Sequence, residues 1–291
     1  MKISIHLGVH CTDEDQLVKS LLKNAEVLSQ EGVFVPGPSR YRSVIRTVLN
    51  KLGGAAPSPD AQDVLLEEIL DNDDADRLVL SNDGFLAVPK WAFRGGMLYK
   101  NAGNNSERIR RLFPDHEVEF FLAVRNPATF VPDLHKMVGG DDFAEFIAGM
   151  DPDTLVWSDV VRDIRSTNPD SPITVWCNED TPLIWPEVMH EVTGIDPQVQ
   201  LMGGFDILGQ IMAKEGMKRL RSYLGTHTPA TEIQRRRVLS AFLDKYAIDD
   251  AVEEELDLPG WTPELIDHLS DVYDDDMIEI GRIPGVTLLT A

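Results

Sequence analysis

Short apolar runs that resemble strands recur along the chain, and helical patterns separate them. The first run alternates apolar and polar residues through Ile3, Ile5 and Leu7, which is the period of a half-buried strand. The predicted strands are residues 2–7, 77–80, 117–124, 173–177 and 285–289. The predicted helices are residues 12–30, 41–52, 60–70, 105–112, 143–150, 154–166 and 181–192.

This alternation of strands and helices predicts the fold class. It favours an α/β fold with a parallel sheet of about five strands and helices on both faces. From residue 205 to residue 280 the pattern is mostly helical, which predicts a helical lobe within one domain spanning residues 1–291. A chain of 291 residues is long enough to bury a full core.

The residues that follow each strand are the first candidates for a site, because ligands of parallel sheets bind beyond the carboxyl ends of the strands. The first strand passes Gly8 and then enters a helical pattern, which is the outline of a phosphate-binding loop. In the loop pattern G-x-x-x-x-G-K-[ST], counted from Gly8, the last three places hold Asp13, Glu14 and Asp15. A phosphate cradle would therefore be filled with carboxylates.

Four segments, in order along nearly the whole chain, resemble the bacterial sulfotransferase-like family. "IHLGVHCTDEDQLVKSLLKN" with "LSQEGVFVPG" is similar to its opening strand, H-x-G-x-H-K-T-G-T-T-S loop and helix. "FFLAVRNPATFVPDLHK" resembles a strand and helix in which R-x-P is followed by a serine eight residues after the arginine. "ITVWCNEDTPLIWPEVMHEVTG" and "LSDVYDDDMIEIGRIPGVTLL" resemble two later segments.

The resemblance implies a P-loop-like α/β fold and transfer of a sulfo group from 3′-phosphoadenosine 5′-phosphosulfate to a hydroxyl or amine. It implies that the first loop holds the 5′-phosphosulfate and that the second motif holds the 3′-phosphate. The positions that correspond to donor-binding residues are Gly8, Cys11, Thr12, Asp13, Glu14, Asp15, Arg125 and Asp133.

Several of these positions depart from the family pattern. Cys11 stands where the family has lysine, and Asp13, Glu14 and Asp15 stand where it has glycine, threonine and threonine. Asp133 stands where the second motif has serine. A like-charge pair at ~4 Å costs roughly 4 kcal/mol at an effective dielectric constant near 20, so an anionic donor should bind far more weakly.

We therefore expect a sulfotransferase-fold protein that has lost the usual donor site, needs no cofactor and acts as a binding or scaffold protein. The acids also have a structural interpretation, since Thr12 and Asp15 have the spacing of a capping box. The alternative is an active transferase with an altered donor site, in which magnesium on Asp13, Glu14 and Asp15 would let a phosphate return.

Asp83 and His10 are the candidate catalytic residues. Asp83 follows the second strand and would act as a general base, or it is a turn residue before Gly84. His10 matches the second histidine of the family's first loop.

Arg40 and Arg42 are the candidate substrate-binding residues, in a segment without acids from residue 32 to residue 59. They would bind an anionic substrate, or they pair with the acidic surface.

The charge balance excludes several partners. The chain has 49 acidic and 27 basic residues, a formal net charge of −22, which repels nucleic acid and anionic membranes. No apolar run approaches the ~20 residues of a membrane span, and no signal-peptide core is visible, so we expect a cytoplasmic protein. The expected partner is a small polar or anionic ligand.

Overall fold

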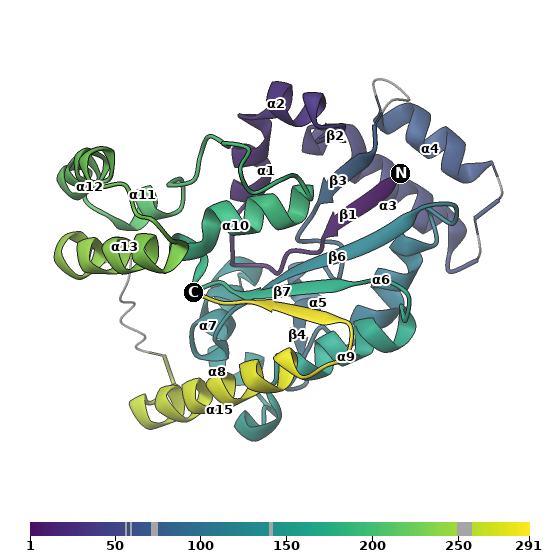
Figure 1. Ribbon diagram of the computed structural model, residues 1–291. Helices are drawn as coiled ribbons and strands as arrows, with labels where there is room; N and C mark the ends of the chain where they lie inside the picture. The colour runs from purple at the N-terminus through teal and green to yellow at the C-terminus, as the bar shows by residue number, and fades with distance from the viewer. Residues whose placement is uncertain (56, 59, 71–74, 140–141, 249–257) are drawn as a thin grey trace.

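Six parallel strands form one sheet in the order β2-β3-β1-β6-β7-β8 (Figure 1). The computed structural model describes residues 1–55, 57–58, 60–70, 75–139, 142–248 and 258–291. The strands of the sheet are β1 (Lys2–His6), β2 (Val33–Phe34), β3 (Arg77–Ser81), β6 (Glu117–Val124), β7 (Ile173–Cys177) and β8 (Val286–Leu289). A separate antiparallel pair consists of β4 (Phe93–Arg94) and β5 (Met97–Leu98).

The α/β fold with a parallel sheet is confirmed, and the five predicted strands lie within one residue of β1, β3, β6, β7 and β8. The sixth strand, β2, has only two residues and pairs with the start of β3 at the sheet edge. Two residues cannot show a periodicity, so the sequence pattern gave no sign of this strand.

Alternate residues of each strand pack into different hydrophobic layers. On β6, Phe120 and Leu122 belong to the larger cluster, and Phe121 and Ala123 belong to the second one. The second cluster lies under α1 (Gln16–Leu22), α2 (Ala25–Gln30) and α10 (Thr181–Thr193). The larger cluster lies under α3 (Pro38–Leu52), α4 (Ala61–Ile69), α6 (Ala102–Arg110), α7 (Pro127–Val138), α9 (Trp157–Thr167) and α15 (Pro263–Gly281). Figure 1 shows helices on both faces.

The predicted helix over residues 12–30 is two shorter helices, because the chain turns between α1 and α2 at Asn24. The Asn24 side chain is buried, donates to the carbonyls of Ser20 and Met202, and accepts from the Met202 N–H. Side chains of this type compete with helical hydrogen bonds. A partner 178 residues away therefore decides where the helix breaks.

The described helices of the predicted lobe, residues 205–280, occupy two places in the molecule, and residues 249–257 of this range lie outside the described residues. The first part packs around its own small core of Leu208, Met212, Leu220 and Leu239. Its helices are α11 (Leu208–Ile211), α12 (Lys214–Thr226) and α13 (Glu232–Tyr246). The second part, α15, instead packs against α7 and α9 over the sheet.

The remaining short elements are α5 (Pro89–Ala92), α8 (Phe143–Phe146) and the 3-10 helix η1 (Pro152–Thr154). Among the helices that the structure describes, none has the length and apolar character needed to cross a bilayer. Strand β1 lies between β3 and β6, so the loops that follow these three strands meet at the carboxyl edge of the sheet. A site of this fold class is expected there.

Candidate functional site

The first loop passes directly over the loop that follows β3. Gly8 has a φ of +90°, and a Cβ at this position would lie 2.5 Å from the Cα of Asp83. Only glycine combines this backbone conformation with such a close approach. The sheet thus brings the predicted positions Gly8 and Asp83 together. Asp83 is exposed and makes no hydrogen bond or ion pair with the described residues.

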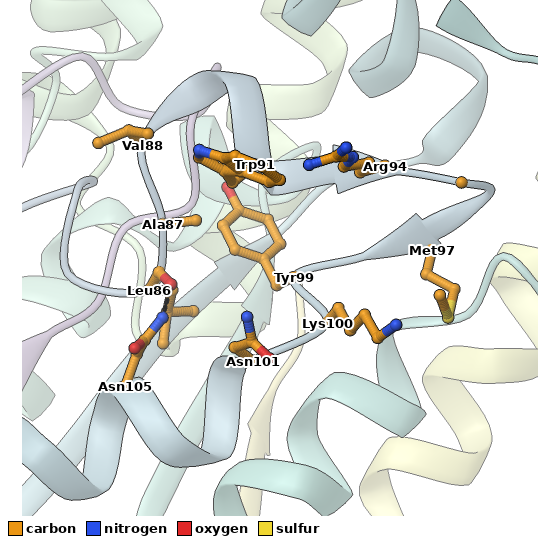
Figure 2. A pocket seen from close by; sticks show the side chains of 11 residues that line it. Leu86, Ala87, Val88, Trp91, Arg94, Met97, Tyr99, Lys100, Asn101 and Asn105 are labelled. Atoms are coloured by element: carbon orange, nitrogen blue, oxygen red, sulfur yellow. Dashed lines mark hydrogen bonds between the residues drawn. The ribbon is translucent and has the colours of Figure 1, made fainter. Parts of the chain in front are cut away.

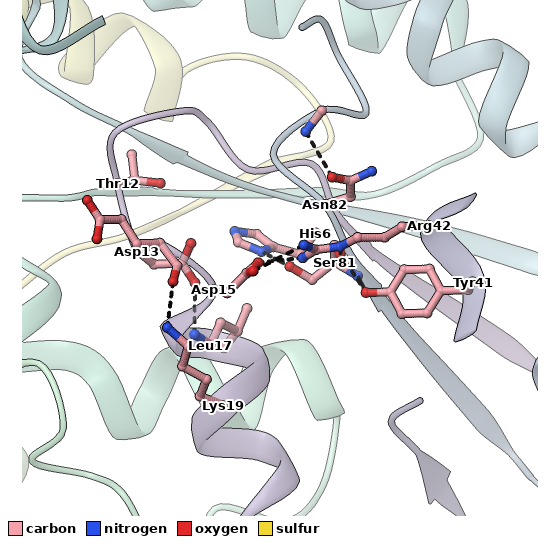
Figure 3. A network of polar contacts seen from close by, with 12 residues as sticks. His6, Thr12, Asp13, Asp15, Leu17, Lys19, Tyr41, Arg42, Ser81 and Asn82 are labelled. Carbon is pink, nitrogen blue, oxygen red and sulfur yellow. Dashed lines mark hydrogen bonds and ion pairs between the residues drawn. The ribbon is translucent and has the colours of Figure 1, made fainter. Parts of the chain in front are cut away.

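The start of α1 is occupied by a carboxylate of the chain itself. Asp13 accepts hydrogen bonds from Gln16 N, through its carbonyl at 2.7 Å, and from Leu17 N, through its carboxylate at 2.8 Å (Figure 3). The predicted capping box is wrong, because the Thr12 hydroxyl donates to the Val9 carbonyl and Asp15 makes no cap. The N–H group and helix dipole that would meet a phosphate therefore already meet Asp13.

Asp15 is turned away from the helix by an arginine of α3. Both its oxygens accept from Arg42, at 3.1 Å for Nη1 to Oδ2 and closer still for Nη2 to Oδ1. Arg42 also donates through Nε to the Ser81 carbonyl at 2.9 Å (Figure 3). The hydrogen bonds from Arg42 hold the pKa of Asp15 below its ordinary value. Arg42 thus pairs with an acid of the chain.

Arg40 is directed elsewhere, although only two residues separate it from Arg42. Its Nε donates to the Glu68 carbonyl and its Nη2 to the Leu70 carbonyl, both at 3.1 Å. These carbonyls lie at the C-terminal end of α4, where a cation is favourable. The two arginines that were expected to form one anion pocket therefore serve two different segments.

Arg125, like Arg42, has a carboxylate partner at this edge of the sheet. Its Nη2 lies 2.7 Å from Asp133 Oδ2, and its Nε donates to Thr129 Oγ1 at 3.0 Å. Its Nη1 donates to the Cys11 carbonyl at 2.7 Å, which ties the loop after β6 to the first loop. Lys136 lies 3.1 Å from the other oxygen of Asp133. Cys11 and Arg125, which the resemblance assigns to opposite ends of a nucleotide, are thus joined by a hydrogen bond.

His10 and Cys11 are poorly placed for chemistry. His10 is buried, its Nδ1 lies 2.6 Å from the Tyr99 hydroxyl, and its N–H donates to the same oxygen at 3.1 Å. Burial lowers the pKa of His10, so its ring is neutral at pH 7. Burial, reinforced by Asp133, raises the pKa of Cys11 to about 12, so its thiol is not an activated nucleophile. Glu14 is exposed.

His6 is the residue of this edge that was not among the predicted site residues. It is only 1% exposed, its ring stacks on Trp176, and its Nδ1 lies 2.8 Å from Ser81 Oγ. Its Nε2 is buried and has no hydrogen-bond partner among the residues that the structure describes. Burial lowers the pKa of His6. A histidine within the predicted strand, two residues before the loop glycine, was the available signal.

The acids of the first loop do not converge on a common point. Asp13 binds the start of α1, and Asp15 binds Arg42. Across the described part of the chain, no group of three or more His, Cys, Asp or Glu residues is arranged to hold a metal ion.

Comparisons of the chain with protein-family models, with curated proteins and with solved structures found no match. The likeness to bacterial sulfotransferases therefore stays a prediction from the four motifs.

Proposed function

We propose that this chain is a sulfotransferase-fold binding protein whose donor site is closed by its own carboxylates. One observation carries the proposal: Arg42 and Arg125, two arginines at this edge of the sheet, are each paired with an acid. Those acids, Asp15 and Asp133, stand where the family that the chain resembles has threonine and serine. A serine or threonine would leave the arginine charge available to a phosphate.

An incoming nucleotide would have to displace these internal partners. Hydrogen bonds to charged groups contribute about 1.5–3 kcal/mol each, so replacing two carboxylates costs about 3–6 kcal/mol before any gain from the ligand. At ~1.4 kcal/mol per tenfold change, this weakens binding by about two to four orders of magnitude. Asp13 adds repulsion, because its carboxylate already occupies the start of α1.

The metal-assisted transferase is the weaker candidate. Magnesium prefers several oxygen ligands around one point, whereas Asp13 and Asp15 face different partners. His10, which would serve as an acid or base, is buried against Tyr99.

The test is a calorimetric titration of adenosine 3′,5′-bisphosphate, with and without magnesium, into the wild type and a triple variant. The variant, Cys11→Lys with Asp15→Thr and Asp133→Ser, restores three of the five positions that depart from the pattern of the resembled family and keeps Asp13 and Glu14. We expect no binding by the wild type in either condition and measurable binding by the variant. Asp159→Ser, an exposed acid on α9, is the matched control for lost negative charge and should not bind.

Micromolar binding of the nucleotide by the wild type would overturn the proposal. Binding by the wild type only with magnesium would favour the metal-assisted transferase instead.

A further inference from the structure

A cavity of about 660 Å³ lies beyond β3, built by α5, the β4–β5 pair and the start of α6 (Figure 2). Its size falls within the ~300–1,000 Å³ of small-molecule sites. Its lining includes the side chains of Leu86, Trp91, Arg94, Met97, Tyr99 and Lys100. None of the predicted site residues lines this cavity.

The cavity presents an aromatic ring to solvent. Trp91 is 51% exposed, and Met97 beside the cavity is 46% exposed. The other four tryptophans of the chain are at most 3% exposed: Trp157, Trp176, Trp185 and Trp261. A single exposed tryptophan in a cavity wall is typical of a surface on which a flat ligand stacks.

The charge of the cavity is opposite to that of the whole chain. The lining includes Arg94 and Lys100 and no acidic residue. Residues 84–106 contain no Asp or Glu, although the chain carries a formal net charge of −22. An anion would be repelled by most of this protein, so a cationic cavity is a favourable place for it.

Both cations of the cavity are available to a ligand. The guanidinium carbon of Arg94 lies 4.1 Å from the centroid of the Trp91 ring. Such stacking uses the face of the guanidinium and leaves its in-plane N–H donors for a carboxylate. Neither Arg94 nor Lys100 forms a hydrogen bond or ion pair through its side chain with any residue that the structure describes.

We propose that this cavity binds a small planar aromatic anion of the aromatic carboxylate class. The ring of the ligand stacks on Trp91 between Leu86 and Met97, and its carboxylate pairs with Arg94 and Lys100. An arginine fork matches a carboxylate in two parallel hydrogen bonds, which fixes the orientation of the ligand. Binding here does not use the cations of the nucleotide site, because Arg42 and Arg125 are not part of the cavity.

The experiment uses 4-nitrobenzoate as the probe and 4-nitrobenzamide as its neutral analogue. Both are flat quenchers of tryptophan fluorescence, so each reports on the exposed Trp91. We expect saturable quenching by the anion and at least ~10-fold weaker binding of the amide, since charge-assisted hydrogen bonds are lost. Equal affinity of the two probes, or quenching by the anion that does not saturate, would overturn the proposal.

Variants then locate the anion in this cavity. Arg94→Gln with Lys100→Gln should weaken 4-nitrobenzoate at least ~10-fold, since both cationic partners are removed. Lys90→Gln removes an exposed charge of α5 that does not line the cavity, so it should bind as the wild type does. Trp91→Phe should lose most of the quenching signal while calorimetry still detects binding. Wild-type affinity in the Arg94 and Lys100 double variant would contradict the assignment.

Discussion

The carboxylate of Asp133 lies 2.7 Å from the guanidinium of Arg125, although eight residues separate them in the chain. Helix periodicity explains the contact, because Thr129 and Asp133 are four residues apart on α7 and share the face that Arg125 meets. A serine at position 133 would occupy the same place without a charge. The residue at position 133 therefore decides whether Arg125 has an anionic partner within the protein.

Asp133→Asn should destabilise the protein by about 1–3 kcal/mol, because a largely buried arginine loses its charged partner. Urea unfolding measures the change. Asp159→Asn is the control, since Asp159 pairs with Arg162 at an exposed position where such pairs contribute about 0–1 kcal/mol. Added sulfate should restore part of the loss in Asp133→Asn by serving as the missing anion. Equal, small losses in both variants would show that the Arg125–Asp133 pair contributes little.

Strand positions were predictable because buried parallel strands are short apolar runs, as in residues 117–124. The break between α1 and α2 was not predictable from the sequence, because it depends on the contact of Asn24 with Met202 far along the chain. The hairpin of β4 and β5 has two residues in each strand and no pattern to detect.

The rule that ligands bind beyond the carboxyl ends of parallel strands located Gly8, Asp83 and Arg125 at one edge of the sheet. It could not show which charges neutralise each other, because the pairs Asp15–Arg42 and Arg125–Asp133 exist only in the folded chain. The cavity at Trp91 left one unused signal in the sequence, the absence of acids from residue 84 to residue 106.

Gly8→Ala should destabilise the protein far more than Gly139→Ala. Both glycines have positive φ, which costs alanine about 1–2 kcal/mol. Only at Gly8 would the new Cβ meet backbone, 2.5 Å from the Cα of Asp83, whereas nothing lies within 4 Å at Gly139. Thermal and urea unfolding of the two variants compare the costs. Similar losses would mean that the loops after β1 and β3 can separate freely.

Stability should fall as the pH drops below about 6.5, because burial lowers the pKa of His6 in the folded state. Below pH 6.5 the unfolded chain binds a proton at His6 more readily than the folded chain does. The contribution of His6 to stability is therefore complete above pH 6.5 and is lost as the pH falls toward the lower pKa of the folded state. One such histidine contributes a slope of up to ~1.4 kcal/mol per pH unit.

Urea unfolding between about pH 7.5 and pH 5.5 measures this slope. His6→Asn should reduce it without abolishing it, because burial also lowers the pKa of His10 and His116. The exposed His227→Asn variant is the control and should keep the wild-type slope. An unchanged slope in His6→Asn would contradict the assignment of this pH dependence to His6.

Tyr99→Phe should loosen the first loop, because one hydroxyl holds both the ring and the backbone of His10, at 2.6 Å and 3.1 Å. Its loss leaves two buried polar groups of His10 without a partner, and we expect a cost of about 1–3 kcal/mol.

Hydrogen exchange at the His10 amide should accelerate in Tyr99→Phe, while amides of β7 keep their protection. Tyr223→Phe on α12 removes an exposed hydroxyl and should change neither quantity. If nitrobenzoate stabilises Tyr99 in the cavity wall, the probe should also slow exchange at the His10 amide in the wild type. Unaltered exchange in Tyr99→Phe would show that the Tyr99 hydroxyl does not hold the loop.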